Sequence, residues 1–570
     1  MNQEDFYISD HPRSTVQLLM RDGRVISGLR GALLESFAKA VQSPEGPMIV
    51  GAVLAGNLRE LTFPVLQEAD VQWVTLEDAD GARIYRRSLT FLLEVAFNRC
   101  YPEAVLTIDH SVSSGGYYCQ VTNLEKFDQQ DLDRVTAEMQ ALVAEDIPFV
   151  REVVPLTEAI DYFKSIGEDD KVRLLKYRQR KDLVLYRADD RRDYHHGYLV
   201  PSSGYLKWFD LILLDHAFIV RFPRRQNPSE LMPMVSYPNL LKTFREYSDW
   251  LNKLGIQSVG ALNDAIQEGH IDEVILVSEA LHEMQISSIA EQIYRKREKV
   301  GAILIAGPSS SGKTTFSKRL SIQLLARGIT PYALEMDNYF IDRAKTPLKA
   351  DGTPDFESLR ALDLERLNHD VRNLIAGVEV HLPHYNFKTG LSEEGDVAKL
   401  NKGDMVILEG IHGLNPGLLT HVDAEDTFRV YVSCLTQLNL DRHNRISTTD
   451  TRMIRRIVRD ARDRGYSAAD TIGRWESVRQ GEKDHIFPYQ ENADVIFNSA
   501  LAYELTALKP LVEPLLRQVP FGTPEYIEAK RLLKFLEWFL PTGTEYIPGN
   551  SILREFVGGS SLTDFSLWNR

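Results

Sequence analysis

A run of small residues that ends in lysine and threonine, Gly307-Pro-Ser-Ser-Ser-Gly312-Lys313-Thr314, matches the phosphate-loop pattern GxxxxGK[ST]. It lies between an apolar run and a helical pattern, where backbone N–H groups can surround phosphates at a positive helix end. Lys313 would contact the β- and γ-phosphates, and the Thr314 hydroxyl would bind Mg²⁺. The alternative is a turn that only caps a helix and binds no nucleotide. The expected nucleoside triphosphate would be held by Gly307, Pro308, Ser309, Ser310, Ser311, Gly312, Lys313, Thr314 and Thr315.

Two acidic residues follow apolar runs of the kind that form buried strands. Asp337 follows the run 331–336, and Glu409 follows the run 404–408. Ligands of open parallel sheets collect beyond the carboxyl ends of the strands. A carboxylate there can hold a metal shell or accept the proton of an attacking hydroxyl. Either acid alone could simply cap a turn, but beside a phosphate loop the pair favours a catalytic site.

Arginines are concentrated near residue 455. Four of them share one helix face through the spacings i, i+3, i+4 and i+7: Arg452, Arg455, Arg456 and Arg459. Arg464 follows just beyond. Concentrated arginines in an acidic protein suit a mobile cover that neutralises a transferring phosphate. Aspartates interleave with them, so a solvated ion-pair face is the structural alternative.

The elements that would position these side chains can be outlined from the hydrophobic pattern. Five short apolar runs, with helical patterns between several of them, predict a parallel sheet wound with crossover helices: 301–306, 331–336, 404–408, 428–432 and 494–497. Nearer the start, strand-like runs flank Asp22-Gly23, which is a hairpin signal. The stretch 225–298 is mostly helical in pattern.

Composition limits the classes of protein that fit. The 570 residues carry 66 Lys+Arg and 81 Asp+Glu, a net charge of −15 that disfavours a dedicated nucleic-acid coat. Three cysteines are too few and too scattered for a disulfide framework or a CxxC metal site. No apolar run is long enough to span a bilayer, and the start MNQEDFYISDHPR has no signal-peptide core. We expect a cytoplasmic protein with no membrane partner.

The C-terminal half resembles uridine kinase of the phosphoribulokinase/uridine kinase family over residues 298–500. The motifs that carry the likeness, in order after the phosphate loop, are Glu-Met-Asp337-Asn-Tyr-Phe, Pro383-His-Tyr385-Asn-Phe387, Ile407-Leu-Glu409-Gly-Ile, the arginine segment 451–465 and Asp494-Val-Ile-Phe. The resemblance implies an ATP- and Mg²⁺-dependent kinase that transfers the γ-phosphoryl group to a nucleoside hydroxyl.

The resemblance also implies a role for individual residues. Asp337 would be the general base, acting with the catalytic groups Lys313, Arg459 and Arg464. Thr314 and Glu409 would bind Mg²⁺. The acceptor would be bound by Asp337, Glu357, Tyr385, Phe387 and Arg452.

Two departures leave the acceptor open. Gly390 stands where uridine kinases have a histidine that recognises the pyrimidine, and Glu357 lacks the usual following His-Pro. Loss of one buried hydrogen-bond partner can change selectivity by orders of magnitude. A sugar phosphate, as in phosphoribulokinase, is therefore an alternative acceptor. An ATP-gated RNA-binding regulatory protein is an alternative from another class.

The first 224 residues resemble the N-terminal region of threonyl-tRNA synthetase, with a TGS-like β-grasp module followed by an editing-type domain. That family's hydrolytic site needs HxxxH on a helix plus a Cys and a His. The corresponding positions here are Arg87, Phe91, His195 and Leu199. His195 and His196 could still coordinate an ion, or be hydrogen-bonded structure. We expect a degenerate, non-hydrolytic binding or regulatory module, with RNA contact open.

The expected architecture is α/β: a P-loop NTPase-type parallel-sheet kinase domain preceded by a β-grasp module and an α+β synthetase-like domain. We divide the chain into a TGS-like module (1–78), a synthetase-like domain with a degenerate editing site (79–224), a helical connector (225–298), a kinase-like domain (299–505) and a helical C-terminal extension (506–570). Self-association into a homo-oligomer stays open.

Overall fold

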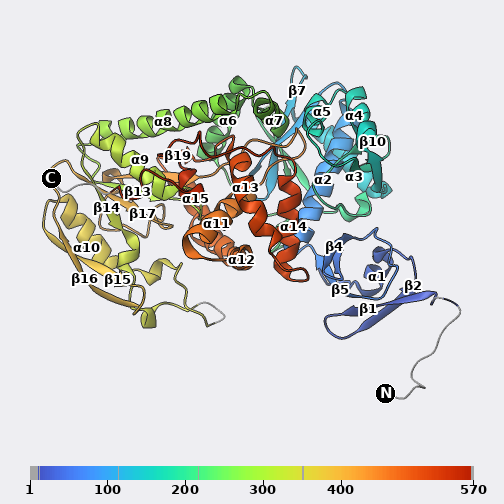
Figure 1. Ribbon diagram of the computed structural model, residues 1–570, viewed down its shortest axis with the longest axis horizontal. Helices are drawn as coiled ribbons and strands as arrows, with labels where there is room; N and C mark the ends of the chain where they lie inside the picture. The colour runs from blue at the N-terminus through green and yellow to red at the C-terminus, as the bar shows by residue number, and fades with distance from the viewer. Residues whose placement is uncertain (1–10, 12, 113, 216, 349–351, 566–570) are drawn as a thin grey trace, which may run out of the picture. The chain divides into compact units, whose positions relative to one another are not determined.

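The computed structural model describes residues 11, 13–112, 114–215, 217–348 and 352–565 (Figure 1). Most of the initial segment, for which we expected no signal-peptide core, lies outside these residues. The chain divides into two compact units. Unit 1 comprises Met1–Val235, Asn439–Arg445 and Val519–Phe535, and unit 2 comprises Ser236–Leu438, Ile446–Gln518 and Leu536–Arg570. Among the helices of the described residues, none has the length and apolar character that a bilayer crossing requires.

Unit 1 begins with a small mixed sheet that packs against a helix. The strand order is β2-β1-β5-β3-β4, and β1 pairs with β2 in the antiparallel hairpin that Asp22-Gly23 predicts. Alternate residues of β1 are buried, so one face of the sheet contributes to the core beneath α1. The bounds are β1 (Thr15–Met20), β2 (Val25–Leu29), α1 (Leu34–Val41), β3 (Ile49–Leu54), β4 (Asn57–Glu60) and β5 (Ala69–Thr75).

The larger part of unit 1 has two antiparallel sheets, with strand orders β11-β12-β7-β6 and β10-β9-β8. Its main core includes the buried face of α2 and residues of α3. The strands are β6 (Val105–Val112), β7 (Gly116–Thr122), β8 (Val150–Pro155), β9 (Asp182–Ala188), β10 (Arg191–Asp193), β11 (Asp210–Leu214) and β12 (Ala217–Arg221). The helices are α2 (Ala79–Cys100), α3 (Gln129–Glu145), α4 (Leu156–Ser165), α5 (Asp169–Leu175) and, except for its last residue, α14 (Pro524–Leu536).

Unit 2 is built on a five-stranded parallel sheet of order β14-β17-β13-β18-β19. Every residue of β13 is buried, as expected for a continuous apolar strand covered on both faces. The strands fall on the five predicted apolar runs, which confirms the P-loop type of α/β fold. Their bounds are β13 (Ala302–Ala306), β14 (Pro331–Glu335), β17 (Met405–Glu409), β18 (Thr427–Ser433) and β19 (Val495–Asn498).

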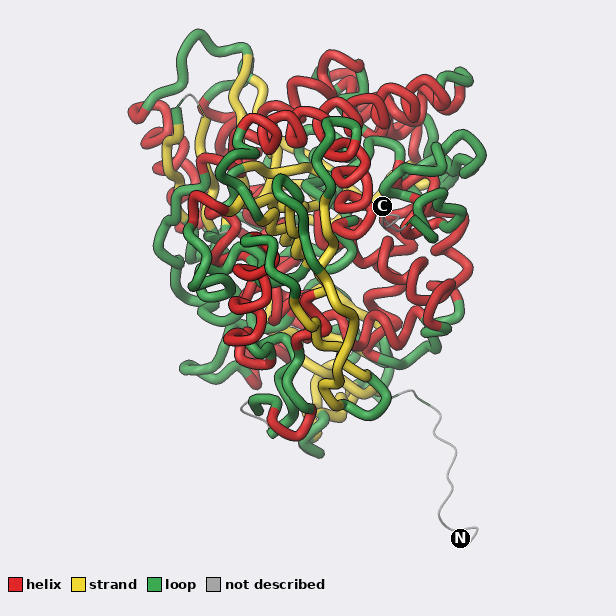
Figure 2. Tube along the Cα trace, turned by 90° about the vertical axis from the view of Figure 1, so that its left-hand side faces the viewer, coloured by secondary structure: helices red, strands yellow, loops and turns green. Residues whose placement is uncertain are grey.

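Helices flank this sheet, and a hairpin extends from it. Helix α9 contacts four of the strands and lies beside the long helix α8, while α10 packs against β17 and β15 (Figure 1). The antiparallel pair β15 (Val380–Asn386) and β16 (Leu391–Ala398) was not predicted. Helix, strand and loop are distinguished by colour in Figure 2. The helices are α6 (Pro238–Leu254), α7 (Val259–Gln267), α8 (Ile271–Arg295), α9 (Lys313–Leu325), α10 (Leu364–Ile375), α11 (Thr448–Arg464), α12 (Ala468–His485), α13 (Glu504–Arg517) and α15 (Arg554–Val557).

The two units cut across parts of the sequence-based division. The connector 225–298 is helical from residue 238 onward, as the pattern predicts. The extension 506–570 is shared, because its stretch Val519–Phe535 belongs to unit 1 and the remainder to unit 2. The boundaries of the five proposed domains themselves stay a prediction.

Candidate nucleotide and acceptor site

The register of the parallel sheet brings the predicted site residues to one level. Glu409, the last residue of β17, is the register partner of Glu335 on β14 and of Ile305 on β13. The phosphate loop starts two residues beyond Ile305, and Asp337 lies two residues beyond Glu335 in a short 3₁₀ helix, Met336–Tyr339. The loop and both predicted acids therefore meet at the carboxyl edge of three adjacent strands.

A threonine and a glutamate form the first contact of this site. The Thr314 hydroxyl donates to Glu409 Oε1 at 2.8 Å. Burial raises the pKa of Glu409, while the ammonium of Lys313 and the Thr314 hydroxyl oppose that rise. Burial lowers the pKa of Lys313, and the charge of Glu409 opposes that change. A hydroxyl and a carboxylate side by side are the hard oxygen donors that Mg²⁺ prefers, so these two residues fit the predicted metal role.

Carbonyl oxygens of the phosphate loop accept hydrogen bonds from surrounding side chains. Lys313 Nζ donates to the Pro308 carbonyl at 3.2 Å, and Arg452 Nε donates to the Ser309 carbonyl at 2.9 Å. The buried hydroxyls of Ser310 and Ser311 have no hydrogen-bond partner among the described residues. Unsatisfied hydroxyls beside the N-terminus of α9 suit an anion with several acceptor oxygens, so the loop fits a triphosphate.

Asp337 has the electrostatic surroundings of a group that can take up a proton. The protein atoms packed around it and the charge of Glu335 raise its pKa, and the ammonium of Lys313 opposes that rise. Its side chain nevertheless reaches solvent. The carboxylate therefore lies within electrostatic range of the phosphate-loop lysine, as a general base beside the transferring group must.

An aromatic wall stands beside Asp337. The backbone N–H of Tyr385 donates to the Asn338 side-chain oxygen at 3.3 Å, which ties β15 to the 3₁₀ helix that carries Asp337. The Tyr385 ring lies 5.0 Å from the Phe387 ring and 5.5 Å from the Phe340 ring. Tyr385 is buried, whereas Phe387 is exposed and available to a planar ligand. The predicted acceptor residues Tyr385 and Phe387 thus form one surface.

The position of the missing histidine is filled by a different side chain. Gly390 has a positive φ of 74°, and a Cβ built there would lie 2.9 Å from Arg343 side-chain atoms. Arg343 Nη2 donates to the Phe387 carbonyl at 2.6 Å. The exposed guanidinium of Arg343 therefore takes the space beside the aromatic wall. The other predicted acceptor residue, Glu357, lies with its carboxylate against Gly481 of α12, where a side chain would not fit.

The arginine helix α11 differs from the mobile cover that its pattern favours. Arg452 and Arg455 are 1% and 0% exposed, and they pair with Glu482 and Glu504. Arg459 lies near the loop and pairs with Glu555 at 3.3 Å. Arg464 is half exposed and pairs with Asp460 at 3.1 Å. The structure brings Arg452 and Arg459 to the loop, and it places Arg464 at the far end of the helix.

Three carboxylates of this site were missed by sequence reasoning: Glu482, Glu504 and Glu555. Glu482 Oε1 accepts from the Ser309 backbone N–H at 3.1 Å, and Glu504 Oε2 accepts from Arg455 Nε at 2.5 Å. They come from α12, α13 and α15. No sequence motif identifies them, because each joins the site through an arginine with which it pairs only in the folded chain.

In unit 1, the positions that correspond to the editing site are packed closed. The Phe91 ring is fully buried and lies 5.0 Å from the His195 ring. Arg87 Nη1 donates to the Tyr198 carbonyl at 2.6 Å. Burial lowers the pKa of His195 to about 3, so its ring is neutral at physiological pH. The contacts fit the expected non-hydrolytic module.

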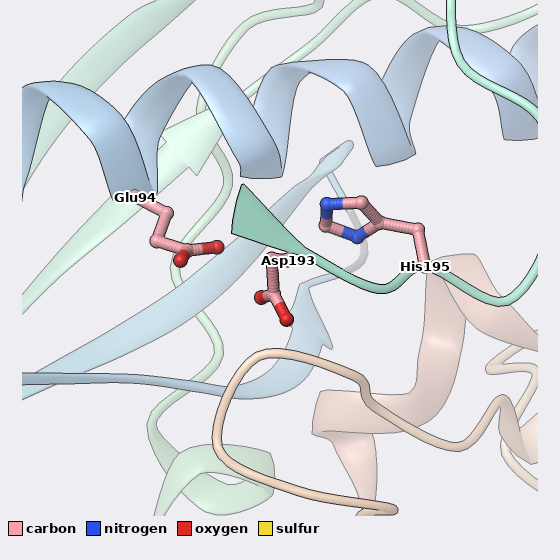
Figure 3. Close-up of side chains that lie close together, drawn as sticks. All are labelled: Glu94, Asp193 and His195. Carbon is pink, nitrogen blue, oxygen red and sulfur yellow. The ribbon is translucent and has the colours of Figure 1, made fainter. Parts of the chain in front are cut away.

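Next to these positions lies a group that we call the buried charge cluster: Glu94, Glu168, Lys171, Asp193 and His443. Lys171 Nζ lies 2.5 Å from Asp193 Oδ2, 2.6 Å from Glu168 Oε2 and 2.9 Å from His443 Nδ1. Figure 3 shows Glu94 on α2, Asp193 at the end of β10 and His195 in the following loop, with the Glu94 carboxylate and the His195 ring both directed toward Asp193. Sequence reasoning did not find this cluster.

Two overlapping sets in this region have the geometry of metal ligands, Glu94 with Asp193 and His195, and Glu94 with Glu168 and His443. The positive charge that such carboxylates need is supplied from within the protein by Lys171 and by Arg191, whose Nε lies 2.6 Å from Glu94 Oε1. We therefore assign no metal to the cluster and interpret it as a structural ion-pair network.

The fold and the site of unit 2 define a P-loop nucleotide-binding protein. Residues 302–505 match the model of the phosphoribulokinase / uridine kinase family, so this region is a P-loop kinase domain. A protein described as a possible uridine kinase from Bacillus stearothermophilus covers 38% of this chain and 100% of its own, at 21% identity and a TM-score of 0.26. D-glycerate 3-kinase from Cryptococcus neoformans covers 37% and 89%, at 12% identity and a TM-score of 0.26. Nothing about the acceptor follows from scores this low.

The chain is also similar to threonyl-tRNA synthetases. The threonine–tRNA ligase of Methylobacillus flagellatus is 34% identical over 170 residues, which is 30% of this chain and 27% of the ligase. The chain therefore spans about a quarter of the length of this curated relative.

Proposed function

We propose that the kinase domain of unit 2 uses ATP to phosphorylate a hydroxyl group of a nucleoside. The observation that carries the proposal is the arrangement at one sheet edge of a general-base candidate, Asp337, within electrostatic range of Lys313 and beside an exposed aromatic surface. A protein that only hydrolyses ATP as a switch has no need of a carboxylate and an aromatic wall positioned for an acceptor.

In this proposal Asp337 orients the acceptor hydroxyl and takes its proton as the phosphoryl group moves. Lys313 and Arg459 offset the negative charge of the phosphates, and the loop amides hold them in line. Phe387 stacks on the planar base of the acceptor. Thr314 and Glu409 would hold Mg²⁺, which when bound supplies additional positive charge beside the phosphates. Positioning and electrostatics carry the rate, without a covalent intermediate.

A sugar phosphate is the second candidate acceptor, and one observation favours it. Arg343 places an exposed guanidinium beside Phe387, at the position from which a pyrimidine-recognising histidine is missing. Guanidinium groups bind phosphate oxygens in bidentate fashion, whereas they offer no particular fit to a neutral pyrimidine. Arg343 thus distinguishes the two classes.

The test is ADP release from Mg·ATP by the full-length protein, with a panel of nucleosides, a panel of sugar phosphates, and tRNA. Stimulation by a nucleoside supports the leading proposal. Stimulation by a sugar phosphate, with a KM that rises about tenfold or more in Arg343→Ala, supports the second candidate. Arg360→Ala, an exposed arginine of the same segment, is the matched control.

Lys313→Ala should remove the stimulated turnover, because loss of one group that stabilises transition-state charge costs about 10²–10³ in rate. Lys299→Ala, an exposed lysine before β13, should leave it unchanged. Stimulation by tRNA alone would contradict the kinase proposal. That result would favour the RNA-binding regulatory role, which we retain as a proposal for unit 1.

A further inference from the structure

The stretch 552–562 lies on the nucleotide loop of unit 2. Glu555 Oε2 accepts from the Thr315 hydroxyl at 3.0 Å and from the Thr315 backbone N–H at 3.4 Å. Its other oxygen, Oε1, accepts from Arg459 Nη1 at 3.3 Å. One carboxylate thus occupies a backbone donor of the phosphate loop together with an arginine predicted to contact phosphate.

The charge of Glu555 is also felt by the other groups of the site. It opposes the fall that burial causes in the pKa of Lys313, and it adds to the rise in the pKa of Glu409. The carboxylate side chain is only 16% exposed. A negative charge at the N-terminus of α9, held by a loop amide and an arginine, occupies the kind of position that a phosphate takes.

Contacts on both sides of Glu555 hold the segment in place. Ile552 packs so closely on the loop that a Cβ on Gly312 would lie 2.4 Å from its Cγ2. The Phe556 ring faces the Arg455 guanidinium at 4.9 Å. Further along, Lys318 Nζ donates to the Leu562 carbonyl at 2.7 Å. The carboxylate is therefore delivered by a packed stretch of chain, 552–562, rather than by a loose tail.

We infer that Glu555 is an internal competitor of the nucleotide: the C-terminal segment 552–562 occupies part of the phosphate site and must release Glu555 when a nucleotide binds. The inference rests on the proposed function, since it assumes that the loop binds a nucleoside di- or triphosphate. A phosphate oxygen and the Glu555 carboxylate cannot both accept from the Thr315 N–H, and their like charges repel at that distance. The apparent nucleotide affinity is the intrinsic affinity multiplied by the fraction of molecules that have released Glu555, so the self-occupied state lowers it.

The direct test is isothermal titration of ADP into the full-length protein without Mg²⁺. Glu555→Gln keeps the size of the side chain and removes its charge. The dissociation constant of this variant for ADP should therefore be lower than that of the wild type by about threefold or more. Glu555→Asp should stay close to the wild type. Glu545→Gln, an exposed glutamate on the same C-terminal stretch, is the matched control and should leave the affinity unchanged.

A second measurement needs no variant and therefore does not depend on a variant that folds. Addition of ADP to the wild type should increase amide hydrogen exchange in the segment 552–562, while Glu504–Arg517 of α13 keeps its protection. Equal or weaker ADP binding by Glu555→Gln, or increased protection of 552–562 on addition of ADP, would overturn the inference and leave the kinase proposal standing. Absence of ADP binding in the wild type and in every variant would overturn both.

Discussion

The phosphate loop of unit 2 and the buried charge cluster of unit 1 are both crowded with ionisable side chains, but they differ in which atoms are left without partners. In the loop these atoms are the hydroxyls of Ser310 and Ser311, which can donate to an anion. In the cluster they are the carboxylate oxygens Glu94 Oε2 and Glu168 Oε2, and the second of these lies 2.6 Å from the ammonium of Lys171. Unsatisfied donors thus mark a site for an anion, whereas the charge of the unsatisfied carboxylate oxygens is offset by Lys171 and Arg191, so density of charge alone does not identify a ligand site.

The largest expected effect is on catalysis at the phosphate-loop site of unit 2. Asp337→Asn should lower kcat by about 10²–10⁴, the usual contribution of a general base, with ADP affinity unchanged. Because the base must be ionised and its pKa is raised, the wild type should lose kcat on acidification at a higher pH than an ordinary aspartate would cause. Steady-state kinetics across pH, together with ADP titration, measures both effects.

Glu335→Gln sharpens this prediction. Removal of that charge should move the acid limb of the kcat profile to lower pH, because Glu335 raises the pKa of Asp337. Equal losses of kcat and ADP affinity in Asp337→Asn would contradict its assigned role.

The next largest effect concerns stability in unit 1. Lys171→Met leaves the carboxylates of Glu168 and Asp193 buried without their cation, which should lower the free energy of unfolding of unit 1 by about 3–5 kcal/mol. Urea denaturation, with hydrogen exchange in α2 as the readout, measures the change in the free energy of unfolding. Lys126→Met removes an exposed ion pair to Asp128 and should cost less than about 1 kcal/mol. A Lys171 variant as stable as this control would show that the cluster does not stabilise the fold.

The smallest effect is a pH dependence within unit 1. The pKa of His195 is about 3 in the folded protein, against an ordinary value of 6.5. The unfolded chain therefore binds a proton that the folded one does not, and stability is lost as the pH falls from 6.5 toward 3. His195→Gln should reduce that loss by about 1.4 kcal/mol per pH unit. Urea denaturation at pH 7 and pH 5 measures it, with His11→Gln, an exposed histidine, as control; identical slopes for both variants would refute the assignment.

Local signals were enough to predict the frame of the nucleotide site. The phosphate loop is a contiguous motif, and the five parallel strands are continuous apolar runs, so Asp337 and Glu409 could be placed at strand ends from sequence. The hairpin that carries Tyr385 was missed because β15 contains Pro383 and β16 is mostly exposed and polar, which obscures the strand pattern.

Contacts between distant segments were beyond the reach of sequence patterns. The spacing of Arg452 and Arg455 shows that they share a helix face, but not that Glu482 and Glu504 lie opposite and bury them. The cluster in unit 1 depends on His443, which is 272 residues from Lys171 in sequence. No local propensity specifies such a meeting, because it follows from the packing of the whole unit.

The three-part composition of unit 1 has a practical consequence for dissecting the protein. A fragment ending at Val235 would lack His443 and also Glu528, whose carboxylate binds Arg83 at 2.9 Å. Such a truncation would remove these two partners of buried or half-buried charges, and it would leave Lys171 without its His443 acceptor. A version of unit 1 that folds alone would also have to carry the segments 439–445 and 519–535, so cutting the chain after residue 235 is a poor way to obtain either unit by itself.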